Sequence, residues 1–98
     1  MHKLVFTKEA LLDIENIGIW YEEQRIGLSY DFELCLEEVI SQIARNPEHF
    51  QVRYKKVKIR FLKRFPYGVH YLLYSNKITI IGVFHTSRSP INWSKRIK

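Results

Sequence analysis

Residues 57–85 read VKIRFLKRFPYGVHYLLYSNKITIIGVFH and contain the clearest strand pattern in the chain. Apolar residues at 57, 59 and 61 alternate with two basic residues and a leucine, which indicates a strand with one buried face. Residues 67–74 and 78–85 are largely apolar on both faces, as is typical of strands inside a sheet. The intervening residues 75–77, Ser-Asn-Lys, favour a tight turn because Asn tolerates positive φ. The pattern predicts three consecutive strands, the last two paired antiparallel.

Two amphipathic helices are predicted before these strands. Thr7 is placed to cap the first helix, because its hydroxyl can accept a backbone N–H of the next turn. Gly27 suits the left-handed conformation that ends helices, and Asn46-Pro47 stops a second helix that begins near Ser29. The first helix has one apolar stripe, formed by Ala10, Leu11, Ile14, Ile17, Gly18 and Tyr21. The second has another, formed by Leu28, Phe32, Cys35, Leu36, Val39, Ile40 and Ile43.

Adding a short strand at residues 2–6 gives the order β-α-α-β-β-β. We therefore expect an α+β fold in which a small antiparallel sheet packs against an N-terminal helical hairpin. Residues 1–98 are expected to form a single domain, since chains of this length seldom divide. The longest apolar run, 78–84, is far shorter than the roughly 20 residues of a membrane-spanning helix. Neither a signal-peptide pattern nor a second cysteine to pair with Cys35 is found, so we expect a cytoplasmic protein that does not engage membranes.

Charge is distributed very unevenly along the chain. The formal net charge is +6. Residues 1–50 hold all ten acids and four bases, a net −6, whereas residues 51–98 hold twelve bases and no acid, a net +12. A half-molecule without carboxylates creates a one-signed field that attracts polyanions or an acidic protein.

The basic residues are densest just before the predicted hairpin. Seven of them fall within twelve residues: Arg53, Lys55, Lys56, Lys58, Arg60, Lys63 and Arg64. Lys56, Lys58 and Arg60 would project from the opposite side of the strand to its apolar residues, as a row of cations able to bind phosphates or carboxylates. The alternative is a solvated sheet face that keeps the strand apart from its neighbours. We favour binding, because no acid in this half of the chain compensates the charge.

His85 is the strongest acid–base candidate among the four histidines. It ends the last predicted strand and precedes Thr86, Ser87, Arg88 and Ser89, so an imidazole, hydroxyls and a guanidinium would lie at one sheet edge. A phosphoryl-transfer ribonuclease needs such a base, an acid and cations for the charged transition state. The alternative, which we favour, is that His85 caps the strand and Arg88 binds a partner. His70, in the middle of an apolar strand, is expected to be structural.

No metal or cofactor site is predicted. The histidines show no pairing at metal-ligand spacing, and Cys35 lies on an apolar helix stripe. The glycines are scattered, so neither a P-loop nor a dinucleotide fingerprint is present. Trp93 lies in the tail Pro-Ile-Asn-Trp-Ser-Lys-Arg, where packing onto the domain is favoured over stacking on a base.

One combination of residues recurs across nearly the whole chain: Tyr21, Gly27-Leu28, Asn46-Pro47, Arg60, Phe65-Pro66-Tyr67, Tyr71, the strand at 78–84 and His85-x-x-Arg88-x-Pro90-x-x-Trp93. This combination resembles the RelE/ParE toxin superfamily, and within it the plasmid stabilisation proteins. The resemblance implies the β-α-α-β-β-β fold. It also implies the toxin of a type II toxin–antitoxin system, a growth inhibitor that a cognate antitoxin holds inactive.

The superfamily includes two activities: RelE-like members cut messenger RNA in the ribosomal A site, and ParE-like members poison DNA gyrase without being nucleases. RelE-like nucleases place an arginine directly after the aromatic that opens the central hairpin, but Gly68 follows Tyr67 here. The last strand ends in His85 where a second arginine would help, and losing one such electrostatic contact typically costs about 3 to 4 kcal/mol. We therefore expect ParE-like inhibition of DNA gyrase.

In this interpretation the basic face and the tail form a protein-binding surface that includes Arg60, Arg64, Arg88 and Trp93. The alternative is a metal-independent messenger endoribonuclease, in which His85 is the acid or base and phosphate is held by Lys56, Lys58, Arg60 and Arg88. A further alternative, supported by charge alone, is a non-toxic nucleic-acid-binding module.

Overall fold

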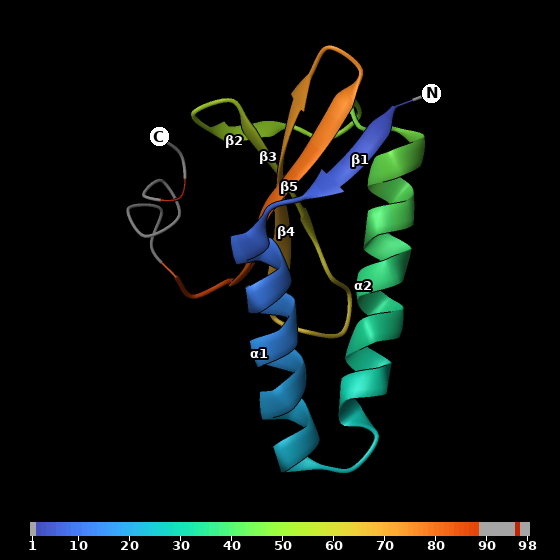
Figure 1. Cartoon of the computed structure of the whole chain (residues 1–98), viewed down its shortest axis with the longest axis vertical. Helices are drawn as coiled ribbons and strands as arrows, with labels where there is room; N and C mark the ends of the chain where they lie inside the picture. The colour runs from blue at the N-terminus through green and yellow to red at the C-terminus, as the bar shows by residue number, and fades with distance from the viewer. Residues whose placement is uncertain (1, 89–95, 97–98) are drawn as a thin grey trace.

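The computed structural model describes residues 2–88 and 96, and it consists of a helical hairpin laid against a five-stranded sheet (Figure 1). The elements follow in the order β1 (Lys3–Phe6), α1 (Lys8–Gln24), α2 (Leu28–Arg45), β2 (Val52–Tyr54), β3 (Val57–Phe61), β4 (Tyr67–Tyr74) and β5 (Lys77–His85). The strand order across the sheet is β1-β5-β4-β3-β2. The predicted α+β fold is confirmed.

Two features of the sheet differ from the predicted order. β1 pairs with β5 in parallel, with Leu4 opposite Ile78, so the sheet is mixed and not wholly antiparallel. The chain between these two strands runs through the helical hairpin and then through β2, β3 and β4, which is ample length for the long connection that a parallel pair requires. β2 was not predicted; it pairs with β3 through a turn in which Lys55 and Lys56 adopt positive φ values of 37° and 68°. The predicted antiparallel pairing of β4 with β5 is confirmed, with Tyr67 opposite His85.

The helix boundaries follow from local capping. The backbone N–H of Ala10 donates to the Thr7 hydroxyl at 3.1 Å, as predicted. Gly27 has a φ of 88°, and its N–H donates to the Glu22 carboxylate, which also accepts from Ser29. These bonds lower the pKa of Glu22, the Gly27 contact most strongly. Neither helix in the described part of the chain is long and apolar enough to cross a membrane.

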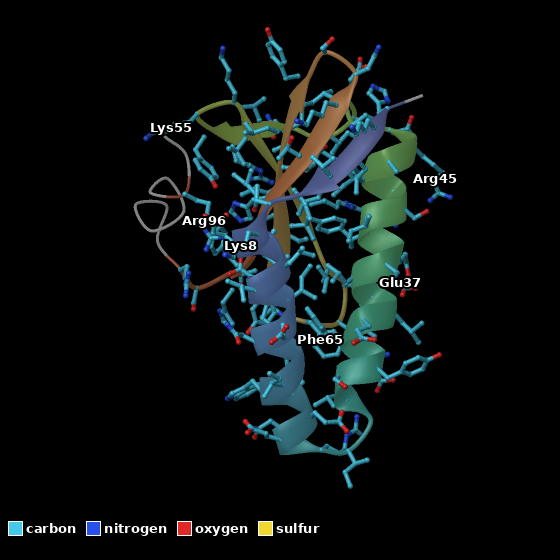
Figure 2. All side chains as sticks on the ribbon, in the orientation of Figure 1. Lys8, Glu37, Arg45, Lys55, Phe65 and Arg96 are labelled. Atoms are coloured by element: carbon cyan, nitrogen blue, oxygen red, sulfur yellow. The ribbon has the colours of Figure 1, made fainter. Side chains whose placement is uncertain are left out.

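The main core lies between the helices and one face of the sheet. Phe65, from the β3–β4 loop, enters between the two helices (Figure 2), where its ring contacts Tyr21 and Phe32 with centroids 4.9 and 5.6 Å apart. The buried Tyr71 hydroxyl donates to the Pro47 carbonyl at 2.7 Å and so ties β4 to the end of α2. Leu11, assigned by its spacing to the apolar stripe of α1, is 54% exposed, so that assignment was wrong.

The other face of the sheet buries His70, which is only 1% exposed. Its Nδ1 is hydrogen-bonded to the Tyr54 hydroxyl at 2.8 Å, and its ring contacts Phe84 edge to face. Burial, assisted by the positive charge of Arg96, lowers the pKa of His70 to about 3. His70 is therefore neutral at physiological pH, in agreement with the structural role expected for it.

Candidate functional site

Two adjoining hollows lie where α1 meets the start of β4 and the end of β5. The larger one, of about 400 Å³, is mostly apolar and is lined by Trp20, Tyr21, Pro66, Tyr67 and His85. The second, of about 190 Å³, is more polar and is lined by Asp13, Asn16, Ile17, Tyr67, Val83, Phe84, His85 and Arg88. Because the two share Tyr67 and His85, we treat them as one site and call it the α1 groove.

His85 lies at the junction of the two hollows. Its position is fixed by the pairing of β5 with β4, which sets its ring edge to face against Tyr67 with centroids 5.2 Å apart. The backbone N–H of Ser87 donates to its Nδ1 at 3.0 Å, and the Ser87 hydroxyl lies 2.7 Å from the same atom. Nδ1 is thus an acceptor, so in this tautomer the ring N–H is at Nε2.

Tyr67 and Arg88 supply the other functional groups at this junction. Burial raises the pKa of Tyr67, and the Arg88 guanidinium opposes that rise in part. The phenol is therefore a neutral hydrogen-bond donor at physiological pH. Arg88 is exposed and lies over the Phe84 ring at 5.5 Å.

Asp13, the one carboxylate among the groove residues, is occupied by structural contacts. β1 runs alongside β5 only as far as Ile80, so within residues 2–88 no strand covers the next part of the β5 edge. Asp13 accepts the Val83 N–H at 3.0 Å, and Arg96 donates both to Asp13 and to the Ile81 carbonyl at 3.0 Å. The acid thus holds the sheet edge and leaves the groove to an imidazole, a phenol and a guanidinium.

The predicted row of basic residues is divided by the fold. Arg60 pairs with Val69 and Lys58 with Tyr71, so both lie on the helix-covered side of the sheet. The Lys58 Nζ donates to the Phe50 carbonyl at 2.5 Å, and the Arg60 Nε donates to Gln42 Oε1 at 2.9 Å. Neither side chain belongs to an open cationic face.

The remaining predicted residues lie in different parts of the molecule. Lys56 occupies the exposed β2–β3 turn, and Arg64 follows β3 with its guanidinium 5.9 Å from the centre of the Phe65 ring. Trp93 lies outside the described residues. Among the described residues predicted to bind or react, His85 and Arg88 line one hollow, and Arg60 and Arg64 line another, between α2 and the end of β3.

The groove residues that were not proposed as site residues from the sequence include Asn16, Trp20 and Tyr67. Trp20 is 54% exposed and lies beside the apolar stripe of α1. Its helical spacing therefore indicates a large aromatic side chain on the surface, which is a recognisable sign of a binding site. Tyr67 was noted only as part of the resemblance. Asn16 gave no signal, because it looks like any polar residue on a solvated helix face.

Comparison with known proteins identifies a family for this fold and groove. Residues 4–90 match the family model described as the ParE toxin of type II toxin-antitoxin system, parDE. A search of curated proteins gives no match. A solved structure described as the chromosomal ParDE TA system from P. aeruginosa is 18% identical, covers 87% of this chain and 96% of its own, and has a TM-score of 0.66, which supports the fold. Because the family model spans most of its length, the chain belongs to the ParE toxin family of type II toxin–antitoxin systems.

Proposed function

We propose that this chain arrests growth by inhibiting DNA gyrase and that the α1 groove is a protein-binding surface. Membership of the ParE family makes it a toxin of a type II system and implies a cognate antitoxin as its partner. The target and the role of the groove are the parts that require a test.

The observation that carries the proposal is the separation of the groups that RNA cleavage would need together. An acid, a base and the cations that stabilise the transition state must reach the same few atoms. Arg60 lies opposite Val69 and His85 opposite Tyr67, so β4 runs between β3, which carries Arg60, and β5, which ends in His85. The Arg60 guanidinium is moreover bonded to Gln42 of α2.

The composition of the α1 groove supports a protein partner. Trp20 is half exposed and packs edge to face on Tyr21 with centroids 5.2 Å apart. Trp, Tyr and Arg are the residues that most often dominate the energy of protein interfaces. The groove combines all three, with Trp20 at its apolar end and Arg88 at its polar end.

One observation favours ribosome-dependent messenger cleavage as a second candidate. His85, Tyr67 and Arg88 line the same hollow, so one acid–base group, one phenol and one cation could meet a phosphate there. The phenol is kept neutral by its raised pKa and could donate a proton, but it is a poor base.

The test is induced expression in a bacterial host, with growth, messenger integrity and the DNA-damage response recorded together. Trp20→Ala probes the apolar end of the groove and His85→Ala the junction of its two hollows, and His2→Ala is the matched control at a histidine outside it. Purified chain is assayed in parallel for inhibition of gyrase supercoiling.

Growth arrest with intact messenger, an induced damage response and inhibited supercoiling is expected, with arrest weakened in Trp20→Ala. Cleaved messenger that disappears only in His85→Ala would instead make the chain a ribonuclease. Normal growth with nucleic-acid binding would leave a non-toxic binding module.

A further inference from the structure

The end of the sheet at which β1 and β5 begin and β4 stops carries lysines beside an exposed aromatic ring. The strand registers put Lys3 opposite Lys77, and Lys77 opposite Tyr74. We call these three residues, together with Lys55 of the β2–β3 turn, the lysine end. We propose that the lysine end binds a single-stranded segment of nucleic acid, with Tyr74 stacked on a base and the lysines on the phosphates.

The strand pairing brings these residues together from distant parts of the sequence. Residues that are directly opposite on neighbouring strands project from the same face of a sheet, so Lys3, Lys77 and Tyr74 project side by side. They project from the face opposite the helices, because Ile78, the next residue of β5, is buried in the core on the helix side. Since β3 is antiparallel to β4, it begins where β4 stops, which brings Lys55 to the same end (Figure 1).

The stability of the fold does not account for the residues at this end. Like charges directly opposite each other on neighbouring strands are destabilising, and Lys3 and Lys77 are such a pair. Tyr74 is 84% exposed, so its ring contributes little to the core. Lys55 has a φ of 37° and Ser75 a φ of 56°, a region that non-glycine residues seldom adopt. Residues that the fold itself disfavours are typical of functional surfaces.

The positive charge of the lysine end is not neutralised within the described chain. Lys3, Lys55 and Lys77 are exposed, and none of them forms an ion pair among residues 2–88 and 96. Glu48, an acid that follows α2, lies 4.0 Å from His2. The three ammonium groups are therefore available to an anionic partner.

The exposed ring of Tyr74 favours a single strand over other anionic partners. Proteins that bind single strands combine cations along the backbone with an aromatic side chain on which a base stacks. An acidic peptide would use the lysines but not the ring. The bases of a duplex are already stacked on one another and leave no face for it. This inference is independent of the proposed gyrase target, because no residue of the lysine end lines the α1 groove.

The test is fluorescence anisotropy of the purified chain with a labelled oligothymidylate of about twelve nucleotides, measured over a range of sodium chloride concentrations. A duplex of the same length and a labelled polyglutamate peptide are the competing probes. We expect saturable binding that is tightest for the single strand. Tyr74→Ala should weaken it by about tenfold, whereas Tyr74→Phe keeps the ring and should retain the affinity. Lys3→Gln and Lys77→Gln should each reduce the slope of log affinity against log salt by about 0.7, the value for one phosphate contact to a single strand.

Tyr30→Ala and Lys8→Gln are the matched controls. Tyr30 is 62% exposed on α2, and Lys8 is exposed at the start of α1, so both changes remove the same groups from other elements (Figure 2). Both should leave the affinity and the salt slope unchanged. Should Tyr74→Ala fail to fold, Lys77→Gln, at another exposed position, still decides the matter.

Three results would overturn the proposal. The first is polyglutamate bound as tightly as the single strand, which would make the lysine end a site for an acidic protein. The second is a duplex bound as tightly as the single strand, which would exclude stacking on Tyr74. The third is a loss of affinity in Tyr30→Ala or Lys8→Gln as large as the loss in the lysine-end variants.

Discussion

The hydrogen bond between Asp13 and the edge of β5 can be tested directly by mutation. Asp13→Ala removes the acceptor of the Val83 N–H and the partner of Arg96 together. An unsatisfied, partly buried N–H costs about 1 to 3 kcal/mol. The ion pair lies between the surface and buried cases, because the two side chains are 21% and 20% exposed, so its loss adds an intermediate amount.

We therefore expect Asp13→Ala to lower the free energy of unfolding by about 3 kcal/mol. Asp13→Asn keeps the size of the side chain and an oxygen that can accept from Val83, so only the ion pair is lost and about 1 to 2 kcal/mol is expected. For a domain of this length, the larger change corresponds to a fall in Tm of roughly 12 to 24 °C.

Urea denaturation followed by circular dichroism measures both changes. Glu15→Gln, an exposed acid on the same helix, is the control and should change stability by less than about 0.5 kcal/mol. If Asp13→Ala were no more destabilising than Glu15→Gln, Asp13 would not be holding the strand edge, and the assignment of this acid to structure would fail. In that case the Asp13 carboxylate would become available for chemistry in the α1 groove.

Three further predictions concern the core. Tyr71→Phe removes the bond to the Pro47 carbonyl and should cost about 1 to 2 kcal/mol in urea denaturation, and unchanged stability would contradict the role of that bond. Gly68→Ala should lower the free energy of unfolding by about 1 to 3 kcal/mol, because the new Cβ would lie 2.8 Å from Ile59 Cγ2. Gly18→Ala has open space around it and should raise the free energy of unfolding by about 0.5 to 1 kcal/mol. Similar effects at the two positions would refute this prediction. Burial lowers the pKa of His70 to about 3, so on acidification the unfolded chain binds a proton at this residue before the folded chain does. The free energy of unfolding should therefore fall as the pH is lowered from about 6.5 to 3, by up to about 1.4 kcal/mol per pH unit. If the slope were unchanged in His70→Gln, another group would be responsible.

The sequence predicts the elements of this fold better than the way they pair. The alternation at Val57 and Ile59 and the apolar runs of β4 and β5 reflect the burial of each residue, so these strands can be predicted from the local sequence alone. β2 has only three residues, two of them exposed, and offers no period to detect. The parallel pairing of β1 with β5 joins residues more than seventy positions apart, and no local pattern contains that information.

The candidate site shows the same limit more sharply. Alternation correctly puts Lys58 and Arg60 on the face opposite Val57, but it cannot tell which face the helices cover. The apolar residues of β3 face the His70 side, and the two cations face the end of α2. Trp20 could be recognised as exposed from its helical position, whereas its proximity to His85 depends on how α1 packs across β5.

The structure divides the basic residues of the second half of the chain into two groups, those bonded within the fold and those exposed to a partner. Among the described residues, three of its cations are partly buried and bonded to a carbonyl, an amide or an acid: Lys58, Arg60 and Arg96. Lys63 forms an exposed ion pair with Glu38. The exposed bases without such partners include Lys55 and Lys56 in the β2–β3 turn, on elements remote in sequence from Trp20. Charges at exposed turns mainly alter the rate at which an acidic partner associates, whereas desolvated aromatic contacts mainly alter how slowly it leaves. Under the proposed function, attraction of an acidic partner and its retention in the α1 groove would therefore depend on different residues of this fold.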